Sequence, residues 1–198
     1  MRQPGREESS VSAELVGVRV LIITSNTGVE RDELVVPRDQ LRARGAHVTH
    51  AAMEAIDVQT YRHDLIASEP VRPDMALSEA DPEDFDVVVI PGGTVNADKL
   101  RINAEARELV RSTIAAGRPI AAICHGAWLL VDAAVVTGKR LTAYPSLRTD
   151  LINAGAAWAD KPVVRSDAEG WTLITSRNPD DLPDFVDAIT AEFRVRTS

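Results

Sequence analysis

Short apolar runs alternate with helical stretches along most of this chain, and this alternation limits the folds that it can adopt. The runs are VRVLIIT at residues 18–24, AHVTHA at 46–51, DVVVI at 86–90 and PIAAIC at 119–124. Most of them are apolar throughout, which is typical of strands that helices cover on both faces. The rhythm predicts a mostly parallel central sheet between two layers of helices, an α/β/α sandwich.

Helix signals fill the intervals between these runs. A helix is expected up to Arg44, where Gly45 ends it, and Asn103 caps the next helix, NAEARELVRSTIAA, which Gly117 closes. HGAWLLVDAAVV predicts a helix directly after PIAAIC, and the last helix begins at NP, residues 178–179.

The remaining segments are less regular. A short helix is expected around SLRTDLINAG, with strands near PVVRS and WTLITS. Residues 52–80 predict a small β-excursion or a loop. The length of 198 residues fits one domain, which we expect over 16–198, preceded by a polar N-terminal tail over 1–15.

Charge and composition exclude several classes of function. A formal net charge of −8 disfavours nucleic acid and anionic membrane surfaces, and no Lys/Arg stripe offsets it. The single cysteine rules out an intrachain disulfide framework, and the polar N-terminus predicts a cytoplasmic protein. His47 and His50 would point to opposite faces of a strand, so no metal site is expected.

Three chemically unusual features follow strands of the predicted sheet. Glu30 comes after the first strand, Gly92 and Gly93 after DVVVI, and Cys124 after PIAAI. Ligands of open α/β sheets collect at the carboxyl ends of the strands, where loops and helix N-termini meet. The sequence therefore predicts a site with a carboxyl, a glycine turn and a thiol at this edge.

Cys124 is the expected nucleophile. Gly126 suits a sharp strand-to-helix elbow, in which Cys replaces the more usual Ser, and the start of a helix lowers a thiol pKa. The alternative is an inert cysteine buried in the core. The backbone N–H groups of Gly93 and His125, on a turn that Gly92 opens, are candidates for an oxyanion hole, although the glycines could also simply form a tight turn.

The partners of Cys124 are less determined. Glu30 helps a thiolate only if it is protonated and donates a hydrogen bond, or else it is a general base acting on substrate or a solvated helix-end carboxylate. His125 acts through its ring or only through its backbone. Asp98 is the candidate that orients the imidazole, within the chain or from another subunit, or it is a plain surface charge. Tyr144 and Arg177 line the pocket or serve packing and ion pairing.

The motifs AICHG, PGG, GVE, YPSLRTDLINAGAAW and SRNPDDLPDF together resemble the PfpI family, in the wider superfamily of the parkinsonism-linked protein DJ-one. The resemblance runs from about Arg19 to Phe193. It implies a flavodoxin-like sandwich, homodimers or larger assemblies, and a site of Cys124, His125 and Glu30 with an acidic residue from a neighbouring subunit, for which Asp98 holds the matching position.

The chain departs from the family pattern at three places. Ala97 and Ala127 stand where relatives often carry proline, and Thr27 stands where an Asp often precedes GVE. These changes alter the pocket and leave the reacting groups in place. A glutamine amidotransferase, which shares the fold, is excluded because its base is a late histidine and no His follows His125.

Three functions follow from these residues. The first is a stress-protective cysteine enzyme that needs no cofactor and acts on small reactive carbonyl compounds or on glycated protein, as a glyoxalase or deglycase. The second is an intracellular cysteine peptidase or amidase that uses Cys124, His125 and Asp98 on peptide substrates. The third is a non-catalytic redox sensor or holdase in which Cys124 is oxidised.

Overall fold

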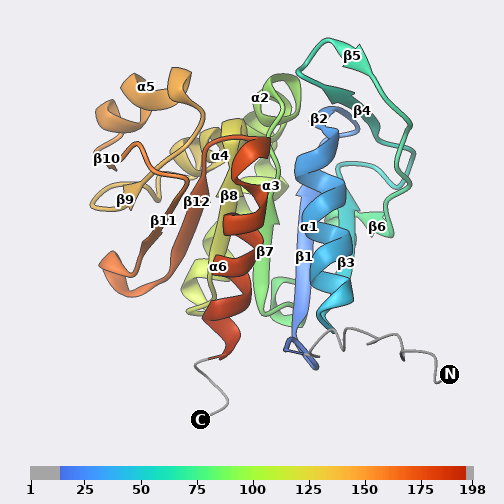
Figure 1. The fold of residues 1–198 in the computed structure, drawn as a ribbon, viewed down its shortest axis with the longest axis horizontal. Helices are drawn as coiled ribbons and strands as arrows, with labels where there is room; N and C mark the ends of the chain where they lie inside the picture. Colours follow the sequence, from blue (N-terminus) through green and yellow to red (C-terminus); the bar gives the residue numbers. More distant parts are fainter. Residues whose placement is uncertain (1–13, 195–198) are drawn as a thin grey trace, which may run out of the picture.

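The computed structural model describes residues 14–194, and its centre is a seven-stranded sheet (Figure 1). In sheet order the strands are β11 (Val163–Ser166), β12 (Leu173–Ser176), β8 (Ile120–Ile123), β7 (Val87–Ile90), β1 (Arg19–Thr24), β3 (His47–Ala52) and β6 (Met75–Ala76). Every neighbouring pair is parallel except β11 and β12, which are antiparallel. The expected mostly parallel sheet is confirmed.

Helices cover both faces of the sheet and complete the α/β/α sandwich. The helices α1 (Arg31–Ala43) and α6 (Leu182–Arg194) lie on one face, and α2 (Thr94–Ile102), α3 (Ala104–Ala115) and α4 (Ala127–Asp132) lie on the other (Figure 1). A smaller unit of α5 (Arg148–Asn153) and the pair β9 (Arg140–Leu141) and β10 (Ala157–Trp158) flanks the β11 edge.

The alternation of side chains along β1 builds both halves of the core. Leu21 and Ile23 pack with the α2, α3 and α4 side, whereas Val20 and Ile22 pack with α1 and α6. All four are fully buried, because a central parallel strand has helices above and below it. Burial of each such side chain stabilises the fold by about 1.5–3 kcal/mol.

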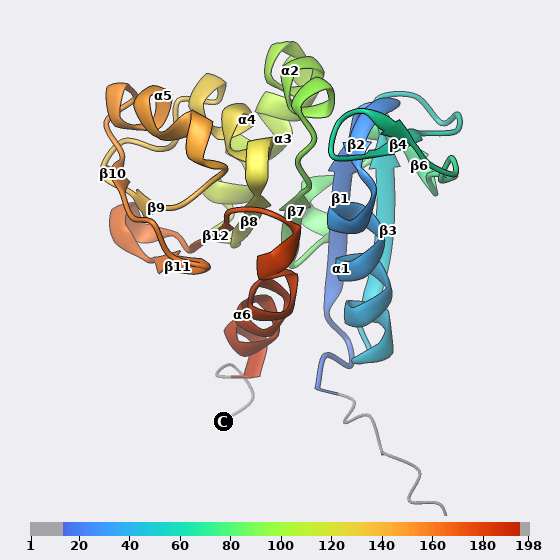
Figure 2. The same cartoon turned by 45° about the horizontal axis from the view of Figure 1, so that its top comes forward.

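Residues 52–80, where a small β-excursion or a loop was expected, contribute two strands to a small second sheet and β6 to the central one. A three-stranded sheet of β2 (Thr27–Glu30), β4 (Gln59–Arg62) and β5 (Ile66–Ala67) rises beside the carboxyl end of β1 (Figure 2). The turn between β4 and β5 is bonded to the start of α2. Short 3₁₀ turns lie at 77–79, 82–84, 124–126, 145–147, 168–170 and 179–181.

Two boundaries differ from the sequence-based expectation. The helix expected over HGAWLLVDAAVV ends at Asp132, because Ala134 adopts a left-handed backbone with φ 59°. Leu15 is fully buried and its N–H donates to Arg44 O, so the folded body begins before Val16. The rest of the expected tail, residues 1–13, lies outside the described residues. Within residues 14–194 no helix is long and apolar enough to cross a membrane.

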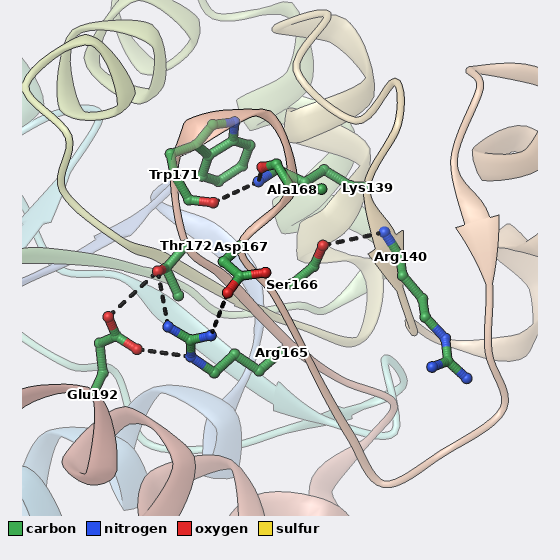
Figure 3. Close-up of polar contacts among 9 residues, drawn as sticks. All are labelled: Lys139, Arg140, Arg165, Ser166, Asp167, Ala168, Trp171, Thr172 and Glu192. Carbon is green, nitrogen blue, oxygen red and sulfur yellow. Dashed lines mark hydrogen bonds and ion pairs between the residues drawn. The ribbon is translucent and has the colours of Figure 1, made fainter. Parts of the chain in front are cut away.

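Lys139 is buried beneath the hairpin that joins β11 to β12. Its Nζ donates hydrogen bonds to the carbonyl oxygens of Trp171 (2.6 Å) and Ala168 and lies 3.7 Å from the centroid of the Trp171 ring (Figure 3). Burial lowers the pKa of Lys139 to about 8. On the far side of the hairpin, Arg165 bonds to Glu192 of α6 (2.9 Å), which ties the edge strand to the helical layer (Figure 3).

Candidate active site

Cys124 sits at the turn between β8 and α4 with φ 59°, in the left-handed region. A non-glycine residue there costs roughly 1–3 kcal/mol and persists only where its surroundings fix it. Here the Cys124 carbonyl accepts a hydrogen bond from Tyr144 N–H (3.3 Å). The side chain is 6% exposed and lines a cavity of about 130 Å³. The geometry is that of a nucleophile elbow.

The cavity lies at the carboxyl ends of the central strands. Its lining residues are Glu30, Glu33, His63, Asp64, Gly93, Cys124, His125, Tyr144 and Pro179. They come from segments that are far apart in the sequence and meet only because β1, β7 and β8 are adjacent and parallel. Within residues 14–194, no three His, Cys, Asp or Glu side chains gather closely enough to hold a metal ion.

Glu33 is the carboxyl beside the thiol. It lies in the first turn of α1, on the same helical stripe as Pro37 and Leu41, and is fully buried. Its Oε2 accepts a hydrogen bond from Gly92 N–H (2.7 Å), and the carboxyl interacts with the Cys124 side chain. Burial, the dominant effect, raises the pKa of Glu33 to about 8, so the carboxyl is mostly protonated at neutral pH.

The thiol and this carboxyl form a coupled pair. Burial and the charge of Glu33 raise the pKa of Cys124, whereas hydrogen bonds from the N–H groups of Gly93 and His125 lower it. The expected lowering of the thiol pKa by the helix end is therefore wrong, because burial, the largest effect, raises the pKa of Cys124. A protonated Glu33 removes the repulsion and can donate its proton to the sulfur, so the pair titrates as a unit.

Gly92 has a different role from the one expected. A Cβ at this position would lie 2.6 Å from Glu33 Oε2 and 2.7 Å from Cys124 Cβ, so a side chain would separate the pair. Its N–H donates to Glu33 and is not available to an oxyanion. The N–H groups that approach the sulfur are those of Gly93 and His125.

The His125 ring lies beside the sulfur. Its Nδ1 is 3.2 Å from Cys124 Sγ, and its Nε2 is 3.4 Å from Ser146 Oγ. The ring stacks on Tyr144, with centroids 4.6 Å apart, and meets Trp128 edge-on at 5.2 Å. Burial lowers the pKa of His125, so the ring is neutral near pH 7 and able to accept a proton.

Glu30 lines the cavity at a different point from Glu33. It ends β2, and its Oε2 accepts a hydrogen bond from His63 N–H (2.8 Å). Burial raises the pKa of Glu30. A protonated donor to the sulfur was one of the roles open to Glu30, but the carboxyl next to the sulfur is that of Glu33.

Of the three outer residues expected in the site, one lines the cavity. This residue is Tyr144, whose ring stacks on that of His125. Asp98 is exposed on α2 and is not a lining residue, so it does not orient the His125 ring within the described chain. Arg177 pairs with Asp181 (2.9 and 3.0 Å) and Asp160 (2.8 Å) and anchors the loop before α6.

Asn96 holds the glycine turn in place and was not foreseen. It is fully buried; its Oδ1 accepts from Ser25 N–H (2.7 Å), and its Nδ2 donates to the carbonyls of Pro91 and Gly92 (both 3.0 Å). These bonds join the exits of β1 and β7. They fix the turn whose N–H groups bind Glu33 and approach the sulfur.

The sequence carried a signal for only some of the missed residues. Glu33 is spaced by four and eight residues from the buried Pro37 and Leu41, so a carboxyl on the apolar stripe of α1 was readable. Asp64 and His63 reach the cavity through the β4–β5 turn, and no local pattern indicates that.

Comparisons with known proteins show the family to which the chain belongs. The DJ-1/PfpI family matches residues 18–192. "Deglycase PfpI" of Pyrococcus furiosus is 35% identical over 165 residues, which are 83% of this chain and 93% of that protein. "Protein/nucleic acid deglycase 2" of Escherichia coli is 35% identical over 79% of this chain and 87% of its own.

Two further relatives complete the comparison. YraA of Bacillus subtilis, named as a candidate cysteine protease, is 38% identical over 77% of this chain and 85% of its own. The crystal structure of Drosophila melanogaster DJ-1beta superposes with a TM-score of 0.78 and 33% identity, covering 89% of this chain and 90% of that one. The fold, the elbow cysteine and these matches together establish that the chain belongs to the DJ-1/PfpI family.

Proposed function

We propose that this protein is a cysteine-dependent enzyme that acts on reactive carbonyl compounds or their adducts. The observation that carries the proposal is Cys124 on its elbow with the buried Glu33 carboxyl on the other side of Gly92. Two relatives that are named deglycases, and that this chain covers over most of their length, support the same reading.

The first step uses the coupled pair. The thiol proton passes to the neutral His125 ring, the Cys124 sulfur adds to an aldehyde carbon, and the carbonyl oxygen then takes a proton to give a hemithioacetal. The developing negative oxygen faces the N–H groups of Gly93 and His125, the same donors that approach the sulfur. Each such donor contributes about 10²–10³ in rate where it has been measured in other enzymes.

The second step moves a proton between adjacent carbons of a dicarbonyl compound. A base removes the proton from the carbon that bears sulfur, and reprotonation at the neighbouring carbon gives a thioester of a hydroxy acid. Water then cleaves the thioester, which releases the acid and restores the thiol. Glu33, with a pKa raised to about 8, and the neutral His125 ring are both suited to carry this proton near pH 7.

The proposal is tested by incubating the protein with methylglyoxal and measuring D- and L-lactate. We expect lactate from the wild type and none above background from Cys124→Ala. A parallel assay follows release of methylglyoxal adducts from N-acetylarginine. Equal rates for wild type and Cys124→Ala in both assays would disprove the proposal.

A cysteine peptidase is the second candidate. It is favoured by the 3.2 Å separation of Cys124 Sγ and His125 Nδ1 and by the relative named as a candidate cysteine protease. We rank it second because two of the relatives above are named deglycases. Fluorogenic peptide cleavage that is lost in Cys124→Ala, together with absent lactate formation, would reverse this order.

A further inference from the structure

The turn between β4 and β5 closes one side of the cavity. Its backbone has a left-handed conformation that residues other than glycine rarely adopt. His63 has φ 53° and Asp64 has φ 62°, both left-handed and neither glycine. Two anchors hold the turn: His63 N–H donates to Glu30 Oε2 (2.8 Å), and Asp64 accepts from the Thr94 N–H (2.8 Å) and Oγ1 (2.6 Å). The Asp64 carboxylate is therefore fixed at the cavity.

Capping of α2 accounts for part of this arrangement. The residue that precedes the helix is Gly93, which has no side chain to cap it, and Asp64 supplies the missing acceptor from another segment. A cap alone would be satisfied by any neutral acceptor. Asp64 also brings a charge to the cavity, because it is one of the lining residues.

The cavity carries three carboxyl groups, and the basic side chains in its lining are the histidines His63 and His125. Glu30, Glu33 and Asp64 line it, and its lining contains neither Lys nor Arg. The neighbouring guanidinium groups are paired elsewhere: Arg31 lies 2.9 Å from Asp32 and 3.7 Å from Glu69, and Arg62 lies 3.8 Å from Asp32. An anion that enters the cavity meets the Asp64 carboxylate and no Lys or Arg side chain.

We propose that Asp64, with Glu30 beside it, selects substrates by charge: carbonyl compounds that are neutral or carry an ammonium or guanidinium group enter, and those with a carboxylate or phosphate are rejected. The identification of the ligand as a carbonyl compound rests on the proposed function. The charge preference itself belongs to the cavity and is measurable without turnover.

The single cysteine provides the measurement. Methanethiosulfonate reagents with a methyl, a trimethylammonium-ethyl or a sulfonate-ethyl group react with a thiolate by the same step: the sulfur attacks the sulfenyl sulfur, a disulfide forms and methanesulfinate leaves. Because Cys124 is the only cysteine, every modified molecule is modified in the cavity. Stopped-flow rates at pH 7 are divided by those of free 2-mercaptoethanol, which removes the intrinsic reactivity of each reagent.

We expect the normalised ratio of cation to anion rates to be about tenfold or more for the wild type at low ionic strength, and to fall as salt is added. Asp64→Asn keeps an acceptor for Thr94 N–H and lowers the ratio several-fold. Glu30→Gln keeps an acceptor for His63 N–H and lowers it further in combination. Glu105→Gln, which removes an exposed carboxylate on α3, leaves the ratio unchanged.

A normalised ratio near one, or a ratio that Asp64→Asn and Glu30→Gln both leave unchanged, overturns the proposal. So does a cavity that reacts with the methyl reagent and with neither charged one. Failure of the proposed function gives a different pattern, in which no lactate forms while the ratio and its response to Asp64→Asn persist. Lactate formation with a ratio near one would retain the function and remove the charge selection.

Discussion

Glu33 and Lys139 are both fully buried, yet one belongs to a reactive site and the other to a structural one. Burial drives both towards the neutral form, raising the pKa of Glu33 to about 8 and lowering that of Lys139 to about 8. Lys139 donates to two backbone carbonyls and packs against the Trp171 ring. Glu33 Oε2 accepts one N–H, and its Oε1 has no hydrogen-bond partner within residues 14–194.

The comparison teaches that burial perturbs a titratable group but does not make it reactive. What separates the two groups is hydrogen-bonding capacity that remains open towards a cavity. Lys139 uses its donors on the backbone of the β11–β12 hairpin, whereas Glu33 lines the cavity and interacts with the thiol. Changing Glu33 should therefore affect chemistry, and changing Lys139 should affect stability.

Glu33→Gln tests the reactive side and has the largest expected effect. Gln still accepts the Gly92 N–H but neither takes up nor releases a proton, so kcat/KM for methylglyoxal should fall by about 10²-fold or more. Thermal unfolding should show a Tm equal to or above that of the wild type, because a buried ionisable group has been removed. Activity within threefold of the wild type would contradict the role of Glu33.

Lys139→Met tests the structural side. The substitution leaves the carbonyls of Ala168 and Trp171 without a donor, so the free energy of unfolding in urea should fall by about 2–3 kcal/mol. kcat/KM should stay within twofold. Lys99→Met, which changes an exposed lysine on α2, is the matched control and should be neutral in both assays. A large loss of activity with intact stability would reverse the comparison.

The pH dependence of stability should show both groups with opposite signs. The folded state holds the Glu33 proton up to about pH 8 and the unfolded state releases it near pH 4.5, so stability falls with rising pH between these values. The slope for this one group is at most about 1.4 kcal/mol per pH unit. Glu33→Gln should flatten it.

Above that window Lys139 acts in the opposite direction. The unfolded chain keeps the ammonium proton up to about pH 10.5 and the folded state releases it near 8, so stability rises with pH across this range. Urea unfolding at intervals from pH 5 to 10 should find this rise reduced in Lys139→Met. A curve of the same shape in the wild type and both variants would disprove the two assignments.

The aromatic neighbour of each region should give the smallest effects. Tyr144→Leu removes the ring stacked on His125 and should lower kcat/KM by about two- to tenfold, in line with 0.5–1.5 kcal/mol for an aromatic pair. Trp171→Leu removes the ring under Lys139 and should lower Tm without changing kcat/KM. A lower kcat/KM in Trp171→Leu, or a lower Tm with unchanged kcat/KM in Tyr144→Leu, would mean that the two regions are energetically coupled.

The architecture was predictable because its signals are local. Continuous apolar runs such as 86–90 and a cap such as Asn103, whose side chain accepts from Ala106 N–H, act over a few residues. The elbow at Cys124 was readable for the same reason. The antiparallel direction of β11 was also readable, because the connection from Ser166 to Leu173 is too short for a parallel crossover.

The residues of the site could be predicted only where they lie at the end of a strand or directly after it. Glu30 and Glu33 are three residues apart, and which of them meets the sulfur depends on the rotation of α1 about its axis. Asp64 lies on the β4–β5 turn, which is more than 25 residues from both Glu30 and Thr94 in the sequence. Only folding brings Asp64 to the cavity.

Gly126 determines the position of the Cys124 sulfur relative to the sheet. A methyl group there would come within 2.5 Å of the Ile90 carbonyl oxygen, so α4 rests directly on β7 at the point where the chain leaves the elbow. Replacing this hydrogen by even one carbon would push the helix entrance outward and carry the thiol away from Glu33. The position of the Cys124 sulfur thus depends on Gly126, two residues further along the chain, having no side chain.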